Sequence, residues 1–191
     1  MKIVHCAGLL GITCSAGVLC ALPVLGQRSI PRKASVVAPA ATCDIQAYNR
    51  ADMRAINVRS GPGTKYKAIR TLPVGPKADV MIVVAGATGQ WLLTDEIHIM
   101  QNDEKGTDQD MKLRGWVYAP LFATRTQGRE NGTIKVWQKA SHRSPVAGRL
   151  ATEVGVTVQG CKGYWVRVRH PKVSGWLDSN SQCGNPVTTC G

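Results

Sequence analysis

Residues 57–66 read Asn-Val-Arg-Ser-Gly-Pro-Gly-Thr-Lys-Tyr, "NVRSGPGTKY", a basic and glycine-rich stretch that precedes an apolar segment. Such a composition would suit a loop that cradles phosphate. A phosphate-binding loop, however, needs a helix directly after its glycines, with a Lys-Ser/Thr pair where that helix begins. The chain continues instead with "KAIRTLPVG" (67–75), a strand pattern interrupted by Pro73. We therefore interpret the glycines as turn residues between strands.

The apolar positions around this stretch recur at a constant offset in the later part of the chain. Val58, Leu72 and Val80 form the first set, and a second set with identical spacing consists of Val136, Leu150 and Val158. Each set is followed by Gly-x-Trp and then by Gly-Trp-aliphatic: "GQW" and "GWV" in the first, "GYW" and "GWL" in the second. This shared order indicates two copies of one small domain.

Both copies consist of short runs rich in β-branched and aromatic residues, and no segment long enough for a stable helix has the periodicity of an amphipathic one. The run "WVRVR" (165–169) alternates apolar and basic residues, which predicts that Arg167 and Arg169 face water on one side of a sheet. About five short strands in each copy are typical of a small closed barrel. The sequence therefore predicts an all-β protein with two small β-barrels in tandem.

The first copy contains an insertion that the second copy lacks. The segment from Trp91 to Trp116 is more than twice as long as the equivalent segment of the second copy, from Trp165 to Trp176. The additional residues fall at about 95–112, a stretch that holds six of the twelve acidic residues. An acidic insertion between two strands is most simply a long hairpin loop.

The N-terminal region has the features of a secretory signal. Residues 1–26 contain Lys2, an apolar segment, and the small residues Val24 and Gly26 at the positions that signal peptidase requires. Polar residues and a proline interrupt the apolar segment, unlike a membrane-spanning helix. Residues 27–42, with two prolines and no periodicity, are predicted to be a flexible leader. We expect a secreted or periplasmic protein without a stable membrane anchor.

Cleavage of that signal would leave four cysteines, Cys43, Cys161, Cys183 and Cys190. An even number in an oxidising compartment predicts two disulfides, and no CxxC or HxxxH spacing suggests a metal site. We expect Cys161–Cys183, because the tail after the last strand would fold back over its barrel, and Cys43–Cys190, because chain ends often lie close together. The competing arrangement, Cys183–Cys190 with Cys43–Cys161, stays open.

At the level of motifs the first copy resembles a known family. The stretch "INVRSGPGTKYKAIRTLPVG" (56–75), then a valine-rich strand, Gly-x-Trp and "GWVYAPLF" (115–122), is similar to the bacterial SH3-type domain over residues 45–123. The second copy, at about 132–184, shares the apolar spacing and both tryptophan motifs. It has "KVWQKASHRSP" (135–145) in place of the Asn-Val-Arg-Ser-Gly-Pro core.

This resemblance implies two SH3-like β-barrels, at residues 43–124 and 132–191, in an exported protein. It also implies binding to bacterial cell-wall peptidoglycan or to proteins. Removal of residues 1–26 takes away one basic residue and leaves a net charge of +11, which favours anionic partners. Export makes nucleic acid the least suitable of these. The expected partner is therefore cell-wall peptidoglycan or an envelope protein, while the oligomeric state stays open.

A second interpretation from a different class also stays open. The chain would then be an adaptor, inhibitor or regulator that docks on another envelope protein, such as a cell-wall hydrolase, through the acidic insertion. Enzymatic activity is not expected, because Cys161 and His170, the nearest nucleophile and base, would lie at opposite ends of a strand about 17–20 Å long. We predict no cofactor and no metal.

The candidate ligand-binding residues are those that the fold does not demand. Four tryptophans recur in both copies and are interpreted as framework residues: Trp91, Trp116, Trp165 and Trp176. Arg59, Tyr66, Tyr118 and Trp137 differ between the copies, and Trp137 occupies the position of Arg59. In a small barrel the first long loop and the strand ends line a groove, where these residues could stack on sugar or peptide. The alternative is ordinary packing of half-buried tyrosines.

Overall fold

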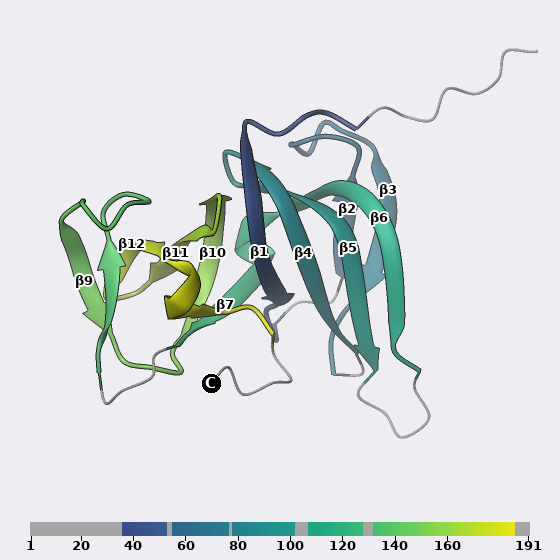
Figure 1. Ribbon diagram of the computed structural model, residues 1–191. Coiled ribbons are helices and arrows are strands. Elements are labelled where there is room, and N and C mark those ends of the chain that lie inside the picture. The colour runs from purple at the N-terminus through teal and green to yellow at the C-terminus, as the bar shows by residue number, and fades with distance from the viewer. Residues whose placement is uncertain (1–35, 53–54, 77, 102–106, 128–131, 186–191) are drawn as a thin grey trace, which may run out of the picture. The chain divides into compact units, whose positions relative to one another are not determined.

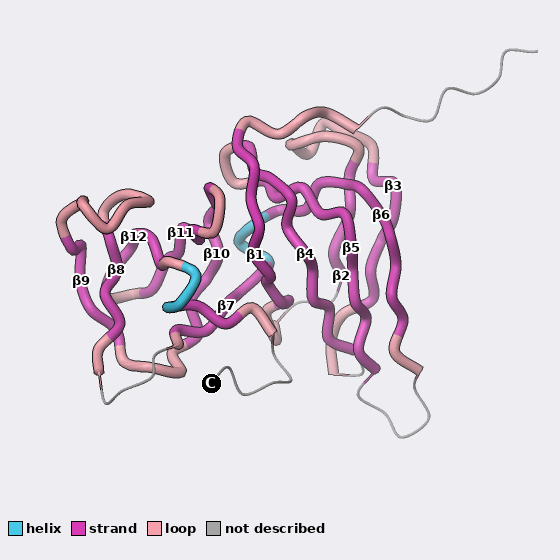
Figure 2. Tube along the Cα trace, viewed as in Figure 1, coloured by secondary structure: helices cyan, strands magenta, loops and turns pink. Residues whose placement is uncertain are grey.

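The structure is a computed structural model that describes residues 36–52, 55–76, 78–101, 107–127 and 132–185. All of these lie in one compact unit, Lys33–Gly191. The described residues form β-strands, turns and two short 3-10 helices, so the predicted all-β class is confirmed (Figures 1 and 2). The predicted signal peptide and residues 27–35 of the predicted leader lie outside the described residues. The rest of that leader is not a flexible linker, because Ala41 and Thr42 belong to the first strand and the Trp116 indole N–H donates to the Val37 carbonyl oxygen at 3.2 Å. Within the described residues no helix is both long enough and apolar enough to cross a membrane.

The first half of the described chain contains six strands and a 3-10 turn. They are β1 (Ala41–Asn49), β2 (Ala55–Arg59), β3 (Ala68–Pro73), β4 (Ala78–Thr88), β5 (Trp91–Gln101), β6 (Gln109–Tyr118) and η1 (Ala119–Leu121). The second half contains the remaining elements. They are β7 (Phe122–Thr126), β8 (Ile134–Trp137), β9 (Val146–Leu150), β10 (Gly155–Lys162), β11 (Trp165–His170), β12 (Val173–Leu177), η2 (Ser179–Ser181) and β13 (Gln182–Cys183).

The strands form one antiparallel sheet whose order is the same on both sides of its centre. The path runs β3-β2-β6-β5-β4-β1-β7-β10-β11-β12-β8-β9, with β13 beside β7. Read outward from the β1–β7 pair, the first half runs β4-β5-β6-β2-β3 and the second runs β10-β11-β12-β8-β9. Among the described strands β3 and β9 end this path without pairing with each other. The hydrogen-bonded sheet is therefore open, and the predicted closure into barrels is not confirmed.

Residue pairing repeats as closely as strand order. In the first copy, Val58 on β2 pairs with Arg70 on β3. In the second copy, the equivalent residues pair in the same way, Val136 on β8 with Gly148 on β9. A bulge follows at once in both hairpins. The six apolar residues from which the repeat was inferred are all buried in one core: Val58, Leu72, Val80, Val136, Leu150 and Val158.

The two glycine-tryptophan motifs need their glycines for different physical reasons. In Gly-x-Trp, Gly89 and Gly163 have φ angles of 57° and 56°, the left-handed conformation that the hairpin turns before β5 and β11 require. In Gly-Trp, the glycine allows two strands to approach. A Cβ atom at Gly115 would collide with the side chain of Val58, and the equivalent Gly175 is crowded by the neighbouring strand β8 in the same way.

The acidic insertion is not the long hairpin loop that the sequence predicted. Strands β5 and β6 continue through it, with Ile97 opposite Met111 and His98 opposite Asp110. Ile97 and Ile99 are 0% and 3% exposed and belong to the core, whereas the residue between them is half-buried. Burial alternates along "EIHIM" at the period of a strand, with Ile97 and Ile99 in the core, and this stretch pairs with β4. Residues 102–106 lie outside the described part.

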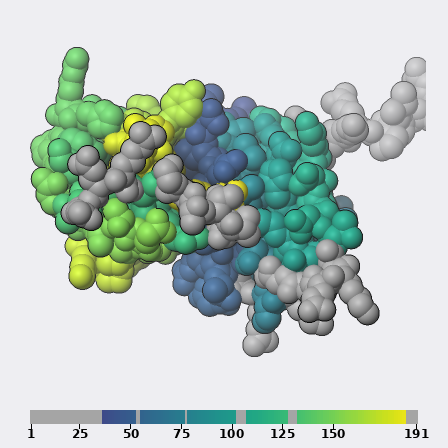
Figure 3. All heavy atoms as spheres, turned by 60° about the horizontal axis from the view of Figure 1, so that its bottom comes forward, coloured from purple at the N-terminus to yellow at the C-terminus, as the bar shows by residue number. Residues whose placement is uncertain are grey.

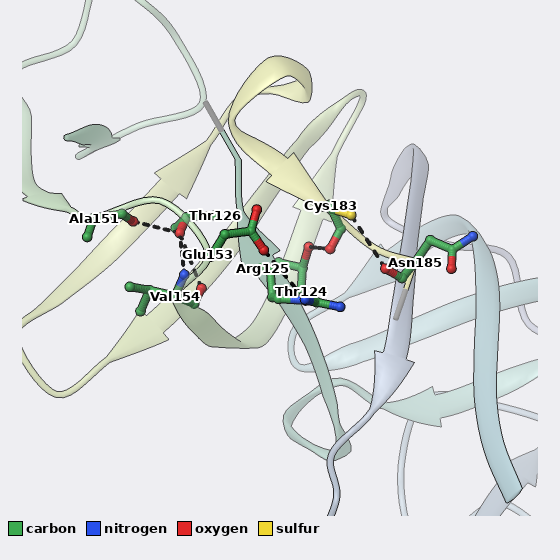
Figure 4. Close-up of polar contacts among 8 residues, drawn as sticks. All are labelled: Thr124, Arg125, Thr126, Ala151, Glu153, Val154, Cys183 and Asn185. Atoms are coloured by element: carbon green, nitrogen blue, oxygen red, sulfur yellow. Dashed lines mark hydrogen bonds and ion pairs between the residues drawn. The ribbon is translucent and has the colours of Figure 1, made fainter. Parts of the chain in front are cut away.

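Strand β7 joins the two halves, because it pairs with β1, β10 and β13 (Figure 1). Its two buried threonines bind backbone groups of the second half (Figure 4). The Thr124 hydroxyl donates to the carbonyl oxygen of Cys183 at 2.7 Å, and the Thr126 hydroxyl donates to that of Ala151 at 2.7 Å and accepts the N–H of Val154 at 2.9 Å. The interior polar groups of the central strand are thus satisfied.

The disulfide bonding differs from the favoured prediction. Cys43 is bonded to Cys161, 118 residues away, with their Cα atoms 5.9 Å apart. The favoured pairs Cys161–Cys183 and Cys43–Cys190 are therefore wrong. Cys183 is also disulfide-bonded, to a partner outside the described residues, and Cys190 lies outside them as well.

This bond follows from the way in which β1 lies against the second half. Backbone hydrogen bonds join Asp44 N–H to the Gly163 carbonyl at 3.0 Å and Gly163 N–H to the Thr42 carbonyl at 2.8 Å. The start of β1 thus runs beside the β10–β11 turn, which brings Cys43 to Cys161. In Figure 3 the dark-blue residues at the start of the described chain lie between the teal residues of the first half and the green and yellow residues of the second.

Candidate functional site

A concavity of about 480 Å³ opens between β2, the loop that follows it, and the ends of β5 and β6. We call it the groove. Its lining includes Asn57, Arg59, Thr64, Trp91, Tyr118 and Leu121. The predicted ligand residues Arg59 and Tyr118 both lie here, so the structure brings together two of the four candidates.

One wall of the groove is aromatic. The rings of Trp91 and Tyr118 lie 5.4 Å apart between centroids, tilted by 51°. Tyr118 is 37% exposed, and its hydroxyl donates to the Gln90 side-chain carbonyl at 3.3 Å. Because Trp91 recurs in both copies, the sequence assigned it to the framework. It lies at the end of a hairpin, half-buried, and its ring also lines the groove.

Arg59 shapes the loop beside the groove. Its Nη1 atom donates to the backbone carbonyls of Thr64 at 3.3 Å and Tyr66 at 2.8 Å, both in the loop between β2 and β3. The positive charge therefore stands at the edge of the groove, held by the loop that it stabilises. An anionic or hydroxyl-rich ligand in the groove would find this cation already in place.

Tyr66 packs within the loop and does not line the groove. Its ring covers Gly61, and a Cβ atom at Gly61 would collide with it. Its backbone carbonyl accepts the hydrogen bond from Arg59. The Gly-Pro-Gly bend and Tyr66 are thus parts of one local arrangement, which corresponds to the packing alternative that the sequence left open for this tyrosine.

Trp137 lies in the second half, at the position equivalent to Arg59, and is surrounded by its own neighbours. Its ring is 5.5 Å from that of His142, and the His142 ring is 4.8 Å from that of Trp165. His142 Nε2 lies 3.0 Å from a carboxylate oxygen of Asp178. At the place that corresponds to the groove, side chains of the second half therefore pack against one another. Trp137 does not join Arg59 and Tyr118.

Two further observations bear on chemistry. In the part of the chain that the structure describes, no three His, Cys, Asp or Glu side chains are placed to hold a metal ion. At the junction of the halves, burial raises the pKa of Tyr48, and the nearby Arg125 guanidinium opposes that rise.

No family model and no curated protein matches the chain. Among solved structures, it is similar to NlpC2 from Trichomonas vaginalis, with a TM-score of 0.30 and 11% identity over 77% of this chain and 52% of that one. It is also similar to NlpC1 from Trichomonas vaginalis, with a TM-score of 0.29 and 9% identity over 81% of this chain and 51% of that one. The chain thus spans about half the length of these two proteins.

Proposed function

We propose that this chain is an exported, non-enzymatic binding protein of the bacterial envelope, built from two SH3-like barrels of the bacterial SH3 type. Its groove would bind the glycan or peptide of cell-wall peptidoglycan. The observation that carries the proposal is the aromatic wall of the half-buried Trp91 and the exposed Tyr118 beside the cation of Arg59. Aromatic faces stack on sugar rings and peptide groups, while an arginine supplies hydrogen bonds to hydroxyl and carboxylate oxygens.

The repeated strand order supports the two-barrel part of this proposal, since each half contains the same five strands after its leading strand. A binding role also suits the histidines. His98 Nδ1 lies 2.6 Å from a carboxylate oxygen of Asp110, and His142 Nε2 lies 3.0 Å from a carboxylate oxygen of Asp178. Both are thereby engaged in contacts within the chain rather than held beside a nucleophile.

The alternative, docking of the acidic insertion on another envelope protein, is less well supported. Asp95 pairs with Arg114 at 2.6 Å, and Asp110 pairs with His98. The Asp108 carboxylate accepts the backbone N–H of Gln101 at 3.0 Å. Arg114 places a positive charge beside one of these carboxylates, and all three have oxygen atoms already engaged within the hairpin rather than free to contact a partner.

Sedimentation with purified, insoluble peptidoglycan tests the proposed function. Tyr118→Ala should lower the affinity about two- to tenfold, the effect of losing one stacked ring. Tyr164→Ala is the matched control, because Tyr164 is also exposed, at 61%, and does not line the groove. Specific binding by the unmodified chain should persist as salt rises from about 0.1 M to about 1 M, where the Debye length falls to about 3 Å. Binding that vanishes with salt, or equal effects of both variants, would contradict the proposal.

A further inference from the structure

Tyr118 also lines a second concavity, of about 630 Å³. We call it the junction cleft, because residues of both halves line it. From the first half come Arg50, Gln90 and Tyr118, and from the second come Gln159, Arg169 and His170. Tyr118 lines both the groove and the junction cleft, so the two concavities adjoin.

The two sides of the junction cleft are tied together by polar contacts. The Gln90 side-chain amide donates to the Gln159 side-chain carbonyl at 2.8 Å, which links the two halves directly. The Tyr118 hydroxyl in turn donates to Gln90 at 3.3 Å. The β1–β7 pairing and the Cys43–Cys161 disulfide add further links between the halves. The cleft is thus held in place before any ligand arrives.

The charges of the junction cleft have one sign. No Asp or Glu side chain is among the described residues that line it. Arg50 is held by the Pro120 carbonyl at 3.4 Å and by Asp52 at 2.9 Å, which partly balances its charge. Arg169 is an exposed residue of β11, and no hydrogen bond or ion pair within the described residues engages its guanidinium.

His170 adds a further hydrogen-bond donor to the residues that line the cleft. Its Nδ1 atom accepts the backbone N–H of Lys172 at 3.2 Å. This contact leaves Nε2 as the nitrogen that carries the proton in the neutral ring, so the histidine can donate even when it is uncharged. Arg50, Arg169 and His170 thus all line the same cleft, and each side chain carries hydrogen-bond donors.

We propose that the junction cleft binds an oxyanion, either a carboxylate or a phosphate, that belongs to the ligand of the groove. This inference rests on the proposed function for the ligand's neutral part, which would stack on Trp91 and Tyr118. Arg169 is the principal contact, because it is the arginine of the cleft without an ion-pair partner among the described residues. Charge-assisted hydrogen bonds from arginine to an oxyanion are among the strongest polar contacts in proteins.

The test measures the binding of small anions to the full chain by calorimetric titration at constant ionic strength. The probes are tripolyphosphate for the phosphate source and triglutamate for the carboxylate source. Arg169→Gln should weaken binding of the preferred probe about tenfold or more, the effect of losing a hydrogen bond between charged groups. Arg167→Gln is the matched control, since Arg167 is an exposed arginine of the same strand that does not line the cleft. It should change binding less than twofold.

Each outcome has a clear meaning. Tighter binding of either probe, with selective loss in Arg169→Gln, supports the inference and identifies the source of the oxyanion. Equal weakening by Arg167→Gln and Arg169→Gln would mean that only the net positive charge attracts the probes, and it would overturn the inference. The absence of binding by either probe would also overturn the inference. If peptidoglycan sedimentation depends on Tyr118 while the anions show no selectivity, the proposed function stands and the cleft fails. If the anions bind selectively and peptidoglycan does not bind at all, the inference about the cleft stands and the proposed function fails.

Discussion

At the scale of single residues, the stretch from Asn57 to Tyr66 is a loop whose parts support one another. Arg59 binds the carbonyls of Thr64 and Tyr66, and the Tyr66 ring lies over Gly61. The loop forms one side of the groove, and its shape depends on the absence of a side chain at Gly61. The packing of the loop therefore sets the shape of one side of the groove, and Arg59 takes part in both.

The first prediction concerns this contact. Gly61→Ala should destabilise the chain by about 1–3 kcal/mol, because its methyl group overlaps the Tyr66 ring. In a Tyr66→Ala background the same change should cost less, since the ring is gone. Urea unfolding of the two single variants and the double variant measures this coupling. Strictly additive effects would show that the two residues do not interact.

The second prediction concerns pH. Burial raises the pKa of Tyr48 above its ordinary value of 10.0, so folding favours the neutral phenol. Above about pH 10 the unfolded chain loses this proton first, and the stability that Tyr48 contributes is lost as pH rises through its folded pKa. Tyr48→Phe should therefore lose less stability than the unmodified chain between about pH 9 and pH 11. Urea midpoints across that range test it, with Tyr164→Phe as the matched variant that should follow the unmodified profile.

At the scale of elements, the insertion is an extension of the β4–β5–β6 sheet. Its inward residues are part of the core, and its outward residues pair across the hairpin, as His98 does with Asp110. Deleting an insertion that lengthens strands changes the stability of the chain differently from deleting one that lengthens a loop. A loop can be shortened at little cost, whereas shortened strands expose the core that they covered.

The third prediction follows from this difference. Ile97→Ala should destabilise the chain by about 2–5 kcal/mol, because Ile97 is 0% exposed. Glu96→Ala, on the neighbouring and partly exposed position of the same strand, should change stability by no more than about 0.5 kcal/mol. Thermal melts followed by circular dichroism measure both. Deletion of residues 96–112 should likewise lower the melting temperature strongly. An unchanged melting temperature would indicate that the segment behaves as a loop and contributes nothing to the core.

At the scale of the whole molecule, the two halves are joined through β1 and β7 and through a disulfide that spans 118 residues. A crosslink that closes so long a loop restricts the unfolded chain strongly. The chain-entropy estimate for it is about 5 kcal/mol. The same links hold the walls of the junction cleft, so the disulfide connects stability to the proposed binding surface.

The fourth prediction concerns this bond. The double variant Cys43→Ser and Cys161→Ser should lose up to about 5 kcal/mol of unfolding free energy, measured by urea titration. Tryptic digestion without reduction should give residues 34–50 crosslinked to residues 150–162, the peptides that contain these two cysteines. A crosslink from residues 34–50 to residues 173–191 would contradict the bond. The Thr42→Ala variant, next to Cys43, is a control that keeps the crosslink.

The sequence by itself determined the all-β class, the repeat of six core residues and the glycine positions of the turns. These properties are local: a side-chain period of two defines a strand, and a left-handed φ favours glycine wherever it occurs. The strand nature of the insertion was also present locally, in the alternation of Ile97 and Ile99. Only the tertiary structure decided that Cys43 pairs with Cys161, that Trp91 faces a groove and that Arg50 and Arg169 line one cleft. Each of these depends on contacts between residues far apart in the chain, which no local pattern encodes. The disulfide and the cleft depend on how β1 meets the second half, and the groove depends on how β2, β5 and β6 pair.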